Sequence, residues 1–195
     1  LTEFSAHLQN NDYVFGGRPS LADFALLGPL YAHLYRDPAS REVMERVAPN
    51  VARWVERTIS SQSHVGSQNG GDLIGDDMIP DTLLPLFQRH ATEHFPVLAD
   101  TIILFDKWCE TASSGDDVPR SFGQVPFVVG GCEGQTLALS FSLLRLQAAL
   151  DALENLSDTD RKGAEAFLTR IHGGDLLSFR MNHRLERKNS KLYLA

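Results

Sequence analysis

The stretch His90–His94, HATEH, holds the strongest chemical pattern in the sequence. On a helix, H-x-x-E-H places two imidazoles on one face with a carboxylate beside them, as in inverted zinc proteases. Such a site needs a third ligand, and no helical motif among the later acids nominates one. We favour the alternative, an amphipathic helix whose core stripe is Leu84, Phe87, Ala91 and Phe95. We therefore predict no metal site.

Cys132 lies in a glycine-rich turn, where an accessible thiolate would serve as a nucleophile or a redox sensor. No cation lies beside it in the sequence, and the neighbouring Glu133 disfavours a second negative charge. The alternative, which we prefer, is a small apolar residue without chemistry. Cys109 and Cys132 also lack the spacing of a zinc site or a disulfide scaffold.

Five cations crowd the last stretch of the chain, at Arg180, Arg184, Arg187, Lys188 and Lys191. They form a local positive patch that would suit phosphates or anionic lipid, or they belong to a solvated extension. The whole chain has a net charge of −7, which argues against a general nucleic-acid binder. No apolar run approaches the roughly 20 residues that span a bilayer.

Tyr31, His33, Tyr35 and Arg36 lie near the end of a predicted apolar helix. They would line a cleft, with Tyr31 and Tyr35 as candidate substrate-binding residues, or they pack with their polar tips outside. The sequence contains no nucleophile–base pair, phosphate loop or carboxylate dyad. We therefore predict no catalytic residue.

That helix begins at a predicted capping box formed by Ser20 and Asp23. A serine followed three residues later by an acid, before an apolar run, is typical of a helix N-terminus. The helix over 21–36 is apolar almost all round, which predicts a central, buried position. Pro29 should kink it, because proline removes one backbone bond and clashes with the preceding turn.

With 195 residues, 43% hydrophobic and 22% charged, the chain can bury a substantial core. Its periodicity predicts an all-α fold, mainly a helical bundle, with one small β-hairpin near 124–139. We expect two separate helices on either side of Phe95-Pro96. The predicted domains are a helical unit over 1–59, a flexible linker over 60–79, a mostly helical extension over 80–179 and a basic tail over 180–195.

The first 60 residues resemble the C-terminal helical domain of the cytosolic glutathione transferase superfamily. Members carry G-x-x-[ST]-x-A-D at the start of the core helix, and Gly17–Asp23, GRPSLAD, fits that pattern. The apolar helix and the later helix VARWVER follow in the expected order. The resemblance implies that Ser20 and Asp23 are the structural capping pair of this domain.

In that superfamily the glutathione site and the catalytic residue lie in an N-terminal thioredoxin-like domain, which this chain lacks. The resemblance therefore implies no cofactor within the chain itself, and glutathione as co-substrate if such a domain is present in the protein. It implies the thioredoxin-like domain as partner and allows a homodimer. The two cysteines without disulfide spacing and the lack of a secretory signal pattern predict a reducing compartment, so we expect a cytoplasmic location. Because the sequence starts at Leu1 within a predicted helix, we expect a fragment of a longer protein.

Two functions stay open from the sequence. The chain is either part of a glutathione-dependent transferase, where it supplies the acceptor-site wall and domain-interface packing, or a non-catalytic protein-interaction or scaffolding module with the same fold. Fold resemblance alone does not decide between them.

Overall fold

The computed structural model describes residues 1–60, 71–75 and 78–195. The chain forms two compact units, Leu1–Leu86 and Phe87–Ala195. The linker predicted over 60–79 falls mostly outside the described residues, so the predicted domain boundaries stay a prediction.

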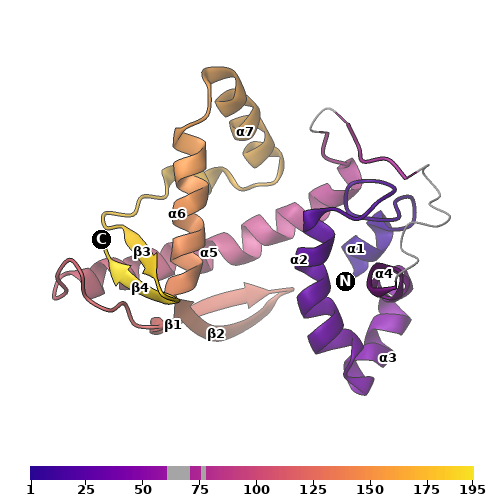
Figure 1. Cartoon of the computed structure of the whole chain (residues 1–195), viewed down its shortest axis with the longest axis horizontal. Helices are drawn as coiled ribbons and strands as arrows, with labels where there is room; N and C mark the ends of the chain where they lie inside the picture. The colour runs from indigo at the N-terminus through magenta and orange to yellow at the C-terminus, as the bar shows by residue number, and fades with distance from the viewer. Residues whose placement is uncertain (61–70, 76–77) are drawn as a thin grey trace. The chain divides into compact units, whose positions relative to one another are not determined.

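Short helices make up the first unit (Figure 1). In chain order they are α1 (Thr2–His7), α2 (Leu21–Pro29), the π-helix η1 (Leu30–Tyr35), α3 (Pro38–Val47), α4 (Pro49–Ile59) and the 3-10 turn η2 (Asp81–Leu83). The chain continues as a helix through Pro29, and the wider π turns follow, with the Arg36 N–H donating to the Tyr31 carbonyl at 3.0 Å. A π segment is one way in which a helix adjusts to a local disturbance of its bonding ladder.

The core of the first unit lies on α4. Val51, Trp54 and Val55 are fully buried there, as the apolar face in the sequence predicts. The ring of Phe4 on α1 meets the Trp54 indole edge-on, with 5.2 Å between the ring centroids. Met44 on α3 is also fully buried, so three helices contribute to one core.

Asp23 is a fully buried carboxylate at the start of α2. Its Oδ2 accepts the return bond of the capping box from the Ser20 N–H at 2.8 Å and a second bond from the Ser20 hydroxyl at 2.7 Å. Its Oδ1 accepts from the Val14 N–H at 2.9 Å and from the Trp54 indole N–H at 3.0 Å. One side chain therefore joins the loop before α2, the helix itself and α4.

The predicted central, buried position of the 21–36 helix is wrong. Within α2 only Asp23 is buried, whereas the side chains of Leu21 and Phe24 are 86% and 55% exposed. The physical reason is that α2 attaches to its unit through a polar contact on one face, and none of the elements in the described part of the unit covers the opposite apolar face. In η1, Tyr35 is buried.

A tight loop contact closes the first unit. The Gly17 N–H donates to the Asp72 carbonyl at 2.8 Å, and the Ile74 N–H donates to the Phe15 carbonyl at 2.9 Å. Gly16 has φ +114°, and a Cβ there would lie 2.6 Å from the Asp72 carbonyl oxygen. Only glycine meets both conditions, so this position depends on its missing side chain.

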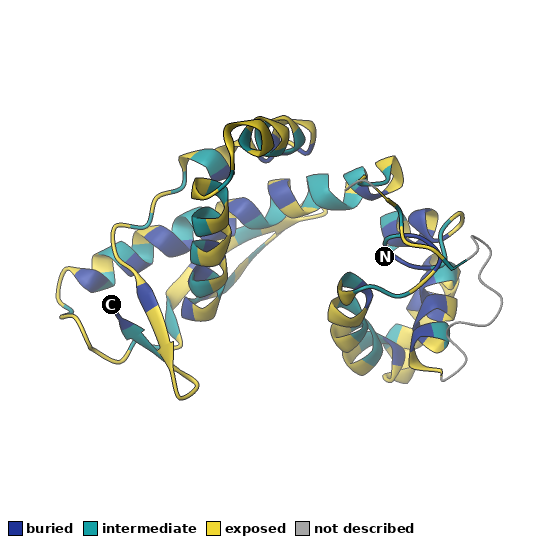
Figure 2. Cartoon of the chain, turned by 45° about the horizontal axis from the view of Figure 1, so that its top comes forward, coloured by how far each residue is buried: buried dark blue, intermediate teal, exposed yellow. Residues whose placement is uncertain are grey.

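The second unit has one long helix, two shorter ones and two hairpins among its described residues (Figure 1). Its elements are α5 (Leu84–Cys109, which begins in the first unit), β1 (Ser121–Val129), β2 (Cys132–Leu139), α6 (Ser140–Glu154), α7 (Asp158–Arg170), the 3-10 turn η3 (Gly174–Ser178), β3 (Leu185–Lys188) and β4 (Lys191–Leu194). In Figure 2 buried residues form dark bands that alternate with exposed ones along the helices.

The predicted break at Phe95-Pro96 is wrong, because α5 runs through Pro96 without interruption. Pro96 and Thr92, one turn earlier, are both exposed. The Thr92 carbonyl, which loses its usual helical partner to the proline, therefore faces a side of the helix that water can reach. Phe95 and Val97 stay buried on the other side.

The predicted hairpin near 124–139 is confirmed. β1 and β2 pair antiparallel, with Val129 opposite Cys132, across a turn in which Gly130 and Gly131 have φ +56° and +79°. This left-handed pair is the turn that matches strand twist. Val125 and Ala138 from the hairpin are buried against Val97 of α5.

The basic tail folds, in part, into a second hairpin that the sequence analysis missed. β3 and β4 pair antiparallel, and Leu185 and Leu194 face each other as a buried pair. The Gln147 side chain of α6 accepts from the Leu185 N–H at 2.8 Å and donates to its carbonyl at 3.1 Å. An amide on a helix thus completes the edge of the strand.

The mainly helical fold class with a small hairpin is confirmed, with the second hairpin as an addition. None of the helices in the described ranges is long and apolar enough to cross a membrane.

His7 is a fully buried titratable residue of the first unit. Its Nδ1 lies 2.7 Å from the Thr82 hydroxyl and its Nε2 lies 3.3 Å from the Tyr13 carbonyl oxygen. Burial lowers the pKa of His7, and the Tyr13 and Val14 carbonyls and Asp23 oppose that shift without cancelling it.

We predict that replacement of Asp23 by alanine lowers the free energy of unfolding of the first unit by about 2–4 kcal/mol, because two buried N–H donors and the half-buried Ser20 N–H lose their acceptor. The matched control is Asp37→Ala, which removes an exposed cap of α3 that accepts from Ala39 and Ser40. The control should cost only about 0.5–1 kcal/mol. Urea unfolding followed by circular dichroism measures both, and equal losses in the two variants would contradict the anchoring role of Asp23.

His7 should make the first unit less stable in mild acid. A histidine whose folded pKa is lowered favours the neutral form, so its contribution is complete above the unfolded pKa of about 6.5 and falls as the pH drops below it. In His7→Gln the slope of unfolding free energy against pH between about 6.5 and 5 should be shallower than in the parent chain. Equal slopes in His7→Gln and the parent chain would show that the pKa of His7 does not change on unfolding.

Candidate functional site

The two imidazoles of the His90–His94 stretch lie on one face of α5, as the motif requires. Their ring centroids are 5.1 Å apart and the rings are tilted by 32°. Partial burial lowers the pKa of His90 and of His94, and the charge on His90 lowers the latter further. Both shifts favour the neutral imidazole, which is the form that binds a metal.

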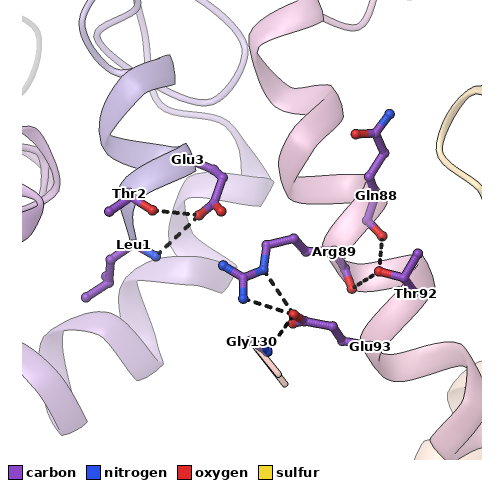
Figure 3. A network of polar contacts seen from close by, with 8 residues as sticks. All are labelled: Leu1, Thr2, Glu3, Gln88, Arg89, Thr92, Glu93 and Gly130. Carbon is purple, nitrogen blue, oxygen red and sulfur yellow. Dashed lines mark hydrogen bonds and ion pairs between the residues drawn. The ribbon is translucent and has the colours of Figure 1, made fainter. Parts of the chain in front are cut away.

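Glu93, the third member of the motif, is occupied by structural contacts (Figure 3). Its Oε1 accepts from Arg89 Nη2 at 2.9 Å and Nε at 3.2 Å, and from the Gly130 N–H at 3.0 Å. These bonds tie α5 to the β1–β2 turn. Among the described residues no group of three or more His, Cys, Asp or Glu side chains could hold a metal ion.

The amphipathic alternative accounts for the stretch without chemistry. Ala91 and Phe95 are buried, and the Phe87 ring meets Phe167 of α7 edge-on at 5.5 Å. His90 lies edge-on to Phe95, with 5.6 Å between the rings. The geometry is that of a helix packed in a core with two histidines at its margin.

The two cysteines differ in environment. Cys132 is exposed at the hairpin turn, and Cys109 is buried at the end of α5; both thiols are free. Burial, with a smaller contribution from Asp106, raises the pKa of Cys109 and makes its thiol less reactive.

Most cations of the tail have partners in the second unit. Arg184 forms two bonds to Asp151, Lys188 pairs with Glu186 at 2.7 Å, and Lys191 pairs with Asp117 at 2.7 Å. The guanidinium of Arg187 lies over the Phe141 ring at 5.9 Å. The local positive patch is therefore largely neutralised, which weakens the phosphate or lipid interpretation.

Tyr31 and Tyr35, the candidate substrate-binding residues, lie together with 6.3 Å between their rings. The Tyr35 hydroxyl donates to Glu56, and this bond raises the pKa of the phenol. Arg41 covers the Tyr35 ring at 4.4 Å, and Arg36 lies 5.9 Å from the Tyr31 ring. The Tyr31 side chain is half-buried, whereas His33 is exposed.

The exposed face of α2 is a continuous apolar stripe that the sequence analysis missed. Leu21, Phe24, Ala25 and Gly28 are all exposed, and their spacing of i, i+3, i+4 and i+7 places them on one side of the helix. Asp23 points to the opposite side, into the unit. Asp23 is the one acid in the otherwise apolar helix α2. This feature of the sequence indicates that the helix contacts the rest of its unit through a polar residue.

A family model described as "Glutathione S-transferase, C-terminal domain" matches residues 1–62. This part of the chain is a glutathione S-transferase C-terminal domain, and the match confirms the resemblance. The comparison with curated proteins and the comparison with solved structures gave no match.

The histidine pair gives a direct test of the metal interpretation. We expect purified protein to contain less than stoichiometric zinc, and His90→Ala and His94→Ala to leave the zinc content unchanged, because no third ligand lies beside the two imidazoles among the described residues. Elemental analysis after dialysis measures this. One zinc per chain that is lost in both variants would revive the metalloprotease interpretation.

Proposed function

We propose that the helical domain at residues 1–62 serves a glutathione transferase-like protein as its C-terminal domain and packs, through the exposed stripe of α2, against a thioredoxin-like domain. In this proposal glutathione is a co-substrate of that domain, and the chain supplies interface packing and a wall of the acceptor site. No catalytic residue is assigned to the chain.

The observation that supports this proposal most is the exposure of Leu21 and Phe24 on a rigidly held helix. Full burial of such a side chain stabilises an association by about 1.5–3 kcal/mol. Asp23 and its donors fix the opposite side of α2, so little conformational entropy is lost when a partner covers the stripe. An apolar stripe with preset geometry is the property that a domain interface needs.

The acceptor-site wall would involve Tyr31 and Tyr35 in different roles. The Tyr35 hydroxyl is committed to Glu56, and its ring lies under Arg41. Tyr31 is half-buried beside it. We propose that Tyr31 contacts an apolar acceptor and that Tyr35 holds Tyr31 in place.

The alternative function is a non-catalytic interaction or scaffolding module in which another protein, or a second copy of the chain, covers the same stripe. This alternative is supported by the composition of the stripe, which contains only apolar side chains. Such a surface needs a partner of matching shape and apolar character, and it needs no catalytic group. Both functions are compatible with our proposal of a cytoplasmic protein.

We predict that the protein at its natural length binds a glutathione column and conjugates glutathione to an electrophilic aromatic acceptor, and that Leu21→Asp with Phe24→Asp abolishes conjugation. A buried carboxylate at each position would prevent the domains from packing. The control is Val43→Asp, an exposed residue of α3 that lies outside the stripe.

The control should conjugate as the parent protein does. If the parent protein shows no column retention and no conjugation, the transferase function is rejected. Loss of dimer or partner binding in the α2 variant, without any conjugation in the parent, would instead support the scaffolding module.

A further inference from the structure

A hollow of about 130 Å³ opens in the second unit between α6, the start of α7 and the chain from η3 to Arg184. It is made entirely by residues after Phe87 and is therefore separate from the α2 stripe and independent of the proposed function. No motif in the sequence pointed to it, because its residues come from segments that lie far apart along the chain.

Six apolar side chains form much of the wall of this hollow. They are Leu150, Leu153, Leu176, Leu177, Phe179 and Met181. Leu176 is buried, and the other five are half-buried, so their free surfaces face a common space. A concave apolar wall of this kind gains free energy when a hydrocarbon group replaces water.

Charged side chains complete the lining, and one pair of them is already matched. Arg184 Nη1 and Nη2 donate to the two oxygens of Asp151 at 3.0 Å and 2.6 Å. This fork raises the pKa of Arg184 and lowers the pKa of Asp151. The bidentate pair is neutral as a whole and closes one side of the hollow.

Two further arginines in the lining have no carboxylate partner among the residues that the structure describes. Arg161 Nη2 donates to the Leu153 carbonyl at 2.8 Å, and Arg180 Nη1 donates to the Leu177 and Phe179 carbonyls at 2.8 Å and 2.7 Å. Within the described ranges neither forms an ion pair, and Glu154 is the one other acid in the lining. The remaining N–H groups of both guanidiniums are therefore available to an anion.

The bonds to backbone carbonyls also hold the two guanidiniums in place before a ligand arrives. A held fork loses less entropy when it binds a planar carboxylate than a mobile side chain does. Arg184 and Asp151 cancel each other, and Arg161 and Arg180 together outweigh the charge of Glu154. The lining of the hollow therefore carries a net positive charge in addition to its apolar side chains.

From this combination we infer that the hollow binds a small amphipathic carboxylate, with its hydrocarbon part on the leucine-rich wall and its carboxylate on Arg180 and Arg161. The volume lies below the roughly 300–1,000 Å³ of drug-sized sites, so the ligand is small, of the size of a short-chain fatty acid. The expected Kd is about millimolar, as suits a ligand with few atoms.

Calorimetric titration of the whole chain with hexanoate, hexanamide, hexylammonium and inorganic phosphate tests this inference. Hexanoate should bind at least about 10-fold more tightly than hexanamide, because the amide has the same tail without the charge. Hexylammonium and phosphate should bind more weakly still, since the first carries the wrong charge and the second lacks a tail.

Arg180→Gln removes one charge and keeps a shorter, polar side chain. It should weaken hexanoate binding about 10-fold and leave hexanamide binding unchanged. The matched control is Arg187→Gln, because Arg187 is an exposed arginine of β3 that lies over Phe141 and outside the lining. The control should bind hexanoate as the parent chain does.

Several outcomes would overturn the inference. The first is the absence of any heat of binding with hexanoate at 10 mM, about 10 times the expected Kd. The second is equal binding of hexanoate and hexanamide, and the third is phosphate binding as tight as hexanoate binding. The fourth is an equal effect of the two arginine variants on hexanoate binding. The melting temperature of each variant shows that the chain is folded, and Arg180 is exposed, so its replacement leaves the core intact.

Discussion

A single buried carboxylate organises the first unit. Asp23 accepts bonds from Val14, Ser20 and Trp54, which lie in the loop before α2, at its N-cap and on α4. A buried carboxyl group is tolerated only when its oxygens find hydrogen-bond donors, and backbone and side-chain donors from the described residues reach both oxygens of Asp23. The orientation of α2 follows from those directional bonds, and an apolar helix can therefore keep an apolar stripe outside.

The second unit relies on the same kind of contact between elements. Glu93 of α5 accepts from the backbone of the β1–β2 turn, and Gln147 of α6 completes the backbone bonds of Leu185 in β3. Small hairpins are marginal on their own, and such bonds fix their register against a helix. Apolar contacts then add strength, as at Val125 and Ala138, without having to define the geometry.

Local patterns were predictable from the sequence, and the contacts between distant segments were not. The α4 stripe and the Gly130-Gly131 hairpin depend on neighbours within a few residues. The continuity of α5 depends on which side of Pro96 meets solvent, which the linear pattern does not contain. The indole partner of Asp23 lies 31 positions away, and the lining of the second-unit hollow is spread from Gln147 to Arg184, so neither left a motif.

The two tryptophans of the chain are divided between the two units, Trp54 in the first and Trp108 in the second. Trp54 is fully buried with its indole bonded to a carboxylate, whereas Trp108 is half-buried and stacks near Phe105 and Phe122. Each unit thus contains its own fluorophore in a distinct setting. Replacement of Trp108 by phenylalanine leaves the emission of Trp54 alone, so the melting of the first unit can be followed optically without any added label.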